Sequence, residues 1–328
     1  MNLFLSGMVR MSTTLAAAGL LGLAQNAVAQ AYPTHAVKVL VPYAPGGGVD
    51  FVSRIVAQQL SEALGQPFVI ENKPGGGTNI AAEQVARSAP DGYTLFAASR
   101  ANAVNATLYK KLSFDIEKDF APISILSDTP NILVVTPSLP ARNLQELIAL
   151  AKAQPGKLSF ASAGTAGSTH LAGELFKSMA GVNIVHVPYR GGAPAAVDLI
   201  SGQVQMYFGT MPSVMNFVRA GKLRAIGVTS LKRAEAEPSY PTLSELGLTG
   251  YRETSWVGFM APAGTPPTII NRLNAEIVRI LNKPEIKNKL RGEGGEIVGN
   301  TPAEFAAFLR KDIATTAGLI KDANITVD

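Results

Sequence analysis

The 328-residue sequence contains no cysteine, only three histidines and a single tryptophan. Without cysteine the chain can form no disulfide, bind no metal through thiolates and carry no lipid on an N-terminal cysteine. The three histidines, His35, His170 and His186, are not spaced with one another or with carboxylates as in known metal sites. We therefore expect neither a metal nor any other cofactor.

A strong excess of charge is also missing. Lysine and arginine number 29 against 24 aspartates and glutamates, a formal net charge of +5. The basic residues are not gathered into the stripe that is typical of nucleic-acid-binding surfaces, so no nucleic-acid partner is expected. The mild positive balance favours acidic solutes slightly.

No apolar run is long enough to span a membrane. A stretch of roughly ten small and apolar residues, 15–24, follows Arg10 and precedes Ala27-Val28-Ala29, the small-residue pattern of a signal peptidase site. We expect cleavage after Ala29 and a mature, freely soluble monomer in the periplasm, with 28 basic against 24 acidic residues. A membrane anchor is the alternative, which the short run disfavours.

Patterns that carry catalysis are weak. Ser168 and His170 are close in sequence, but closeness alone does not make them face each other as nucleophile and base, and no glycine-serine-glycine elbow occurs. We expect a protein that is not an enzyme. The alternative is a hydrolase or transferase that acts on a carboxylated small molecule.

The most informative stretch present is a strand, a glycine turn and a helix. Residues 37–41 form a β-branched run, residues 43–48 a loop with three glycines, and a helix begins near residues 48–50 and ends at Gly65. Bare N–H groups and the partial positive charge of the helix N-terminus favour a carboxylate here. The candidate binding residues are Tyr43, Pro45, Gly46, Gly47 and Asp50.

The alternative for this stretch is a simple connection in which Asp50 caps the helix. A test position is Gly47, where valine is expected to weaken binding because a β-branched residue resists positive φ and would occupy the anion's space.

Further strands at residues 68–71 and 94–98 alternate with helices, which predicts a parallel sheet with ligand-binding loops at its carboxyl edge. Ser99 and Arg100 follow the third strand there. Arg100 is a candidate for pairing with a ligand carboxylate, with a solvated arginine or an ion pair between domains as the alternative.

The second half repeats this plan with strands near residues 158–161, 184–187, 206–208 and 223–228. The loop after the first of these holds hydroxyls and glycines before a helix, and either binds the ligand or merely caps that helix. Its candidate residues are Gly164, Thr165, Ala166, Gly167 and Ser168.

Two strand-like runs, residues 120–126 and 132–135, are separated by Asp128-Thr129-Pro130, and we expect the chain to pass into a second domain there. Residues 254–262, with the tryptophan, are the expected return. The predicted first domain comprises residues 30–129 and 255–328, and the second comprises residues 130–254.

Five motifs in order resemble the Bug-type solute receptors of tripartite tricarboxylate transporters. They are Pro42-Tyr43-Ala44-Pro45-Gly46-Gly47 with Asp50 and Arg54, Glu71-Asn72-Lys73-Pro74-Gly75, Ser162-Ala163-Gly164 with His170-Leu171, His186-Val187-Pro188-Tyr189-Arg190-Gly191, and Ala261-Pro262-Ala263-Gly264-Thr265-Pro266.

This resemblance implies an α/β type II periplasmic binding protein, two α/β domains joined by two crossing strands with the ligand cleft between them. It further implies binding of a small carboxylate through main-chain donors of the two loops, assisted by waters, and membrane transporter components as partners.

The chain departs from relatives in two places. Ala166-Gly167 replaces glycine followed by serine or threonine, so the hydroxyl role passes to Thr165 or Ser168. Near Thr210, another candidate binding residue, the acidic residue of some relatives is missing, which favours simple carboxylic or dicarboxylic acids over amino acids.

Overall fold

The computed structural model describes residues 32–292 and 294–322, so the predicted signal peptide lies outside the described part. The chain divides into two units, Met1–His35 and Ala36–Asp328, and the fold below is that of the second. Within the described residues, no helix is both long and apolar enough to cross a bilayer.

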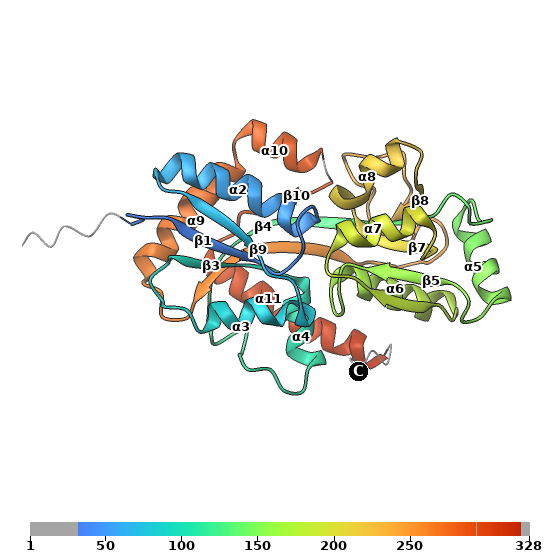
Figure 1. The fold of residues 1–328 in the computed structure, drawn as a ribbon, viewed down its shortest axis with the longest axis horizontal. Helices are drawn as coiled ribbons and strands as arrows, with labels where there is room; N and C mark the ends of the chain where they lie inside the picture. Colours follow the sequence, from blue (N-terminus) through green and yellow to red (C-terminus); the bar gives the residue numbers. More distant parts are fainter. Residues whose placement is uncertain (1–31, 293, 323–328) are drawn as a thin grey trace, which may run out of the picture. The chain divides into compact units, whose positions relative to one another are not determined.

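Five neighbouring strands of a ten-stranded sheet form the centre of the first lobe (Figure 1). Its strands lie in the order β2 (Phe68–Asn72), β1 (Val37–Val41), β3 (Thr94–Ser99), β9 (Thr254–Pro262) and β4 (Phe120–Val135). The first three are parallel, and β9 runs antiparallel to both of its neighbours. The helices of this lobe are α2 (Gly48–Leu64), α3 (Asn79–Ala86), α4 (Arg100–Leu108), α9 (Pro267–Leu281) and α11 (Pro302–Asp322).

One core of this lobe lies between the sheet and α3, α4 and α11. The buried rings of Phe96, Phe120, Trp256 and Phe305 form its centre. Burying rings of this size supplies much of the hydrophobic free energy that holds the lobe together.

The second lobe has helices on both faces of its sheet. The strands are the distal half of β4, β7 (Met206–Thr210), β5 (Ser159–Ser162) and β6 (Val185–Pro188), with β8 (Arg224–Val228) also paired to β4. Leu133 and Val135 pack into the core under α5 (Leu144–Ala153) and α6 (Ser168–Ala180). Ile132 and Val134 pack under α7 (Gly192–Ser201) and α8 (Met211–Arg219), as expected for alternating side chains of a strand.

The two lobes share β4. The sequence predicts two strands interrupted at Asp128-Thr129-Pro130. This prediction is wrong, because β4 is one continuous strand from Phe120 to Val135. It pairs with β9 up to Pro130 and with β7 from Asn131 onward. Pro130 therefore lies where the strand changes partners. The boundaries 30–129, 130–254 and 255–328 stay a prediction.

The remaining elements are the short helix α10 (Pro284–Arg291), the strand β10 (Glu296–Ile297), paired with β4, and a single 3-10 turn, η1 (Gly76–Thr78). The prediction for the first helix is confirmed: α2 begins at Gly48 and Gly65 ends it with φ 70°. Four helices, α2, α6, α7 and α8, directly follow the strands β1, β5, β6 and β7, and this order positions the site.

Candidate functional site

A small cavity of about 30 Å³ lies between the two lobes, where these four helices begin. Gly47, Gly48 and Val49 contribute the start of α2, and Gly167, Ser168 and Thr169 the start of α6. Its other lining residues are Tyr43, Ala163, Gly192, Thr210 and Ser255. None of these eleven residues has a side chain that is charged at neutral pH.

Four helix N-termini therefore contribute to one cavity, because Gly192 is the first residue of α7 and Thr210 is the N-cap of α8. The first N–H groups of a helix have no partner within it, and each N-terminus carries a partial positive charge of about +0.5. The arrangement can hold an anion through main-chain donors and hydroxyls.

Asp50 holds the first loop, residues 43–48, in place. Its Oδ2 accepts hydrogen bonds from the Gly46 N–H and from Arg54 Nε, both at 2.9 Å, and its Oδ1 accepts one from Asn72 Nδ2 at 2.8 Å. Burial alone would raise the pKa of Asp50, but the bonds from Arg54, Asn72 and Gly46 outweigh it and hold the pKa below its usual value. The carboxylate is thus bound by the protein's own donors and does not line the cavity.

Gly47→Val was expected to weaken binding partly because valine resists a positive φ, but the backbone shows that Gly47 does not have one. Gly47 has φ −89° and ψ 171°, which any residue adopts, and the left-handed glycine of this loop is Gly46 with φ 88°. A Cβ on Gly47 would lie 3.5 Å from the Gly192 nitrogen, an ordinary contact. The tight position is Gly48, whose Cβ would lie 2.9 Å from Thr210 Oγ1.

Tyr43 connects the first loop to the end of β3. Its hydroxyl lies 2.9 Å from the Ser99 hydroxyl, and burial raises the pKa of Tyr43 to about 12 despite this hydrogen bond. Ser99 is also the N-cap of α4 in a capping box with Asn102. Tyr43 therefore remains a neutral donor and acceptor at physiological pH.

A second, wider cavity of about 390 Å³ adjoins the small one, because Tyr43 and Ala163 line both. Gly164, Thr165 and the stretch Pro188, Tyr189 and Arg190 form its second-lobe side. The first-lobe side comprises Pro42, Pro74, Gly75, Gly76, Gly77, Thr78 and Ile80. A hydrogen bond of 2.9 Å from the Ala44 N–H to the Arg190 carbonyl joins the lobes beside it.

Some of the predicted site residues line a cavity and the others do not. Tyr43, Gly47, Gly167, Ser168 and Thr210 line the small cavity, and Gly164 and Thr165 line the wide one. The others, Pro45, Gly46, Asp50, Ser99, Arg100 and Ala166, line neither cavity.

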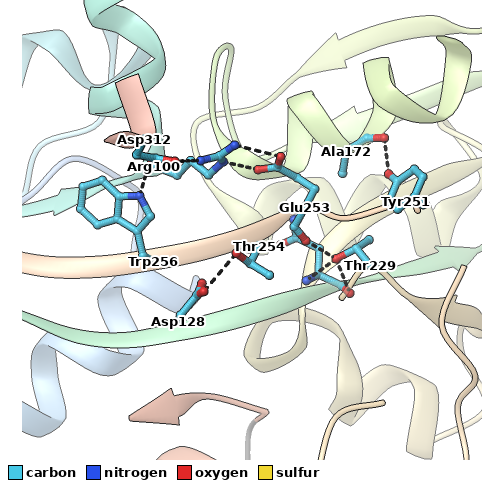
Figure 2. A network of polar contacts seen from close by, with 10 residues as sticks. Arg100, Asp128, Ala172, Thr229, Tyr251, Glu253, Thr254, Trp256 and Asp312 are labelled. Atoms are coloured by element: carbon cyan, nitrogen blue, oxygen red, sulfur yellow. Dashed lines mark hydrogen bonds and ion pairs between the residues drawn. The ribbon is translucent and has the colours of Figure 1, made fainter. Parts of the chain in front are cut away.

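Arg100 forms an ion pair within the protein, which was the alternative to pairing with a ligand carboxylate (Figure 2). Its guanidinium pairs with the carboxylates of Glu253 and Asp312, and Asp312 also accepts a 2.9 Å bond from the indole of Trp256. Burial would lower the pKa of Arg100, but the two carboxylates outweigh it and raise it. Its cationic group is therefore already bound by two anions.

Glu253 anchors this network to the second lobe. Thr229, at the end of β8, donates its hydroxyl to the Glu253 carbonyl at 2.6 Å and accepts the Glu253 N–H at its own carbonyl at 3.0 Å. Burial raises the pKa of Glu253 to about 7, although Arg100 opposes this. The ion pair therefore joins the start of α4 in one lobe to the backbone of the other.

The second loop, residues 164–168, is supported by two histidines that the sequence did not single out as a pair. His170 and His186 stack with ring centroids 3.9 Å apart. Burial lowers the pKa of His170 to about 3, with contributions from His186 and Lys177, and that of His186 to about 4, with a contribution from Lys177. Both rings are neutral at physiological pH.

Sequence reasoning missed the loop at residues 74–78, which lines the wide cavity. Its glycines follow β2 at the same carboxyl edge as residues 43–48, so the argument used for the first loop could have found it. Ser255 and Gly192 carried no comparable signal.

Known proteins resemble this chain in sequence and in fold. The family model "Tripartite tricarboxylate transporter family receptor" matches residues 52–325. Protein BugT of Bordetella pertussis is 36% identical over 303 residues, which cover 92% of this chain and 93% of BugT.

Two solved structures are also similar. The structure of R. palustris Rpa4515 with adipate is 36% identical with a TM-score of 0.88, covering 90% of this chain and 99% of that one. MatC (Rpa3494) from Rhodopseudomonas palustris with bound malate is 31% identical with a TM-score of 0.83, covering 88% and 100%. The expected fold class, that of a type II periplasmic binding protein with two α/β domains, is thereby confirmed. The chain belongs to the tripartite tricarboxylate transporter receptor family, the family of the Bug proteins.

Proposed function

We propose that this protein is an extracytoplasmic receptor that captures a small carboxylic, dicarboxylic or aromatic acid between its two lobes by domain closure. It delivers the acid unchanged to the membrane components of a tripartite tricarboxylate-type transporter. The relatives solved with adipate and malate support this ligand class.

One observation carries the proposal: four helices begin at a small cavity whose lining contains no ionised side chain. A carboxylate there would meet N–H groups of α2 and α6 together with the hydroxyl of Ser168. Charge-assisted hydrogen bonds to a carboxylate are roughly twice as strong as neutral ones, so the preference for an anion is large. We propose that one carboxylate binds here.

The rest of the ligand would occupy the wide cavity. Its volume of about 390 Å³ lies within the range of roughly 300–1,000 Å³ that is usual for small-molecule sites. Tyr43 lines both cavities and offers its ring to an aromatic acid or its hydroxyl to a short one. We do not include Arg100 among the ligand contacts, since Glu253 and Asp312 already bind its guanidinium.

An enzyme acting on the same acid is the competing function. The described residues do contain a serine hydroxyl close to an imidazole, Ser162 Oγ and His186 Nε2 at 2.7 Å. Ser162, however, is fully buried and lines neither cavity. A nucleophile must reach its substrate, so this pair supports a structural role.

Calorimetry on the mature protein tests the proposal. The panel is acetate, succinate, malate, adipate, citrate and benzoate, with the amide of each acid as a neutral control of similar shape. We expect at least one acid to bind and its amide to bind at least tenfold more weakly, while nuclear magnetic resonance shows the acid unchanged after prolonged incubation. Equal binding of acid and amide would exclude recognition of the anion, and conversion of the acid would favour the enzyme.

A further inference from the structure

The second loop rests on a stack of three rings. The imidazoles of His170, on α6, and His186, on β6, are 3.9 Å apart with 19° between their planes, and the ring of Phe160 lies 5.0 Å from His186. Neither histidine lines either cavity. Any part that they play in binding is therefore exerted through the loop.

His170 holds the one alanine of this loop in an unusual conformation. Ala166 has φ 69°, a region that residues other than glycine seldom adopt. Its N–H is buried and donates to His170 Nδ1 at 3.1 Å. A nitrogen that accepts a hydrogen bond carries no proton, so His170 is neutral with its proton on Nε2.

His186 supports the preceding turn through Ser162. The Ser162 hydroxyl donates to the Gly164 carbonyl at 3.1 Å, and the Gly164 N–H lies 3.3 Å from the same oxygen. The hydroxyl has a single hydrogen, so if it is donated to the Gly164 carbonyl, the 2.7 Å contact with His186 Nε2 is donated by the imidazole. His186 would then also carry its proton on Nε2.

We infer that His170 and His186 are positioning residues that, as neutral Nε2–H imidazoles, fix residues 164–167 so that the first N–H groups of α6 point at the bound carboxylate. This inference rests on the proposed function. Protonation of His170 on Nδ1 would remove the acceptor for Ala166 and release the loop. The other ionisable groups facing the pair are Glu174, whose Oε1 lies 3.7 Å from His170 Nε2, and Lys177.

The first test is independent of any ligand. Nitrogen-15 spectra of the mature protein, labelled at histidine, report which ring nitrogen carries the proton. We expect both rings to remain in the Nε2–H form from pH 8 to pH 5. An Nδ1–H form of either ring, or a ring that takes up a proton within this range, would overturn the inference even if the protein binds acids as proposed.

The second test compares two substitutions of His170. Asn presents its Oδ1 where the imidazole presents Nδ1, so H170N keeps an acceptor for the Ala166 N–H, while H170L removes it. With adipate as the probe, or malate if adipate does not bind, we expect affinity within about threefold of wild type for H170N and at least about tenfold weaker for H170L, given the cost of an unpaired buried N–H.

Wild-type affinity in H170L would overturn the positioning role. If H170L does not fold, H170N decides: a stable variant that binds more than tenfold more weakly shows that the acceptor is not what matters. If wild type binds none of the acids, the proposed function fails, and the spectra still test the tautomers.

Discussion

Gly48→Ala is the substitution whose effect follows most directly from the geometry. Gly48 is the first residue of α2 and does not have a positive φ, so alanine suits its backbone. The added Cβ, however, would lie 2.9 Å from Thr210 Oγ1 and 3.1 Å from Thr210 Cβ, across the boundary between the lobes. The substitution therefore opposes the approach of the lobes without disturbing either one.

The magnitude can be estimated from these contacts. Ordinary contacts of a Cβ begin at 3.4 Å, so Thr210 must retreat by about 0.5 Å or rotate and lose its 3.1 Å hydrogen bond to Ser213. Overpacking of this kind costs about 1–3 kcal/mol, or about five- to 140-fold in affinity. Alanine also favours a helix over glycine by up to about 1 kcal/mol, so stability without ligand should be unchanged or higher.

Calorimetry with the acid that wild type binds measures the affinity, and urea denaturation measures the stability. A matched control is available at Gly318, in α11 and away from both cavities, where an added Cβ would contact nothing within 4 Å. Gly318→Ala should bind within about threefold of wild type. Wild-type affinity in Gly48→Ala would refute this account of the contact between the lobes.

Three further predictions concern single side chains. Because the pKa of His170 is lowered to about 3, the unfolded chain binds a proton below pH 6.5 that the folded one does not, so the unfolding free energy decreases as the pH decreases. When the pH is lowered from 7.5 to 5, the unfolding free energy of His170→Asn, measured by urea denaturation, should decrease by about 2 kcal/mol less than that of wild type. An equal decrease in both proteins would contradict this. Arg100→Ala leaves the buried carboxylate of Glu253 and the partly buried one of Asp312 without their cation and should cost about 3–5 kcal/mol of stability, while the folded fraction binds the acid within about threefold of wild type. Loss of binding in a folded Arg100 variant would show that Arg100 itself takes part in recognising the ligand carboxylate. Ser168→Ala should weaken binding at least about tenfold in calorimetry, the equivalent of one charge-assisted hydrogen bond of about 1.5 kcal/mol or more, and an unchanged affinity would exclude the Ser168 hydroxyl from the ligand contacts, since Gly167 and not Ser168 is the N-cap of α6.

Much of the fold could be predicted because it depends on local signals. The β-branched run before a glycine loop gave β1 and the start of α2, and Gly65 gave the end of that helix. The continuity of β4 could not be predicted, because Pro130 normally indicates a break. Here the proline lies where pairing with β9 ends and pairing with β7 begins, so its missing N–H interrupts neither ladder.

In the candidate site too, features that depend on neighbouring residues could be predicted, and contacts between distant segments could not. Main-chain donors at a helix start are encoded by neighbouring residues, so both loops were recognised. The partners of Arg100 lie 153 and 212 positions away in the sequence, and no local pattern indicates them. The stacking of His170 on His186 likewise depends on β5 and β6 pairing beneath α6.

The position of β9 has a consequence for the order in which the protein can be completed. This strand lies between β3 and β4, yet it is synthesised after every strand of the second lobe. Until residues 254–262 emerge from the ribosome, β3 and β4 each present an unpaired edge, which is prone to aberrant pairing with other chains. The second lobe, whose strands are contiguous in the sequence, can finish first. A nascent chain that stops short of β9 would thus have a complete second lobe and an incomplete first lobe, a state suited to binding by chaperones.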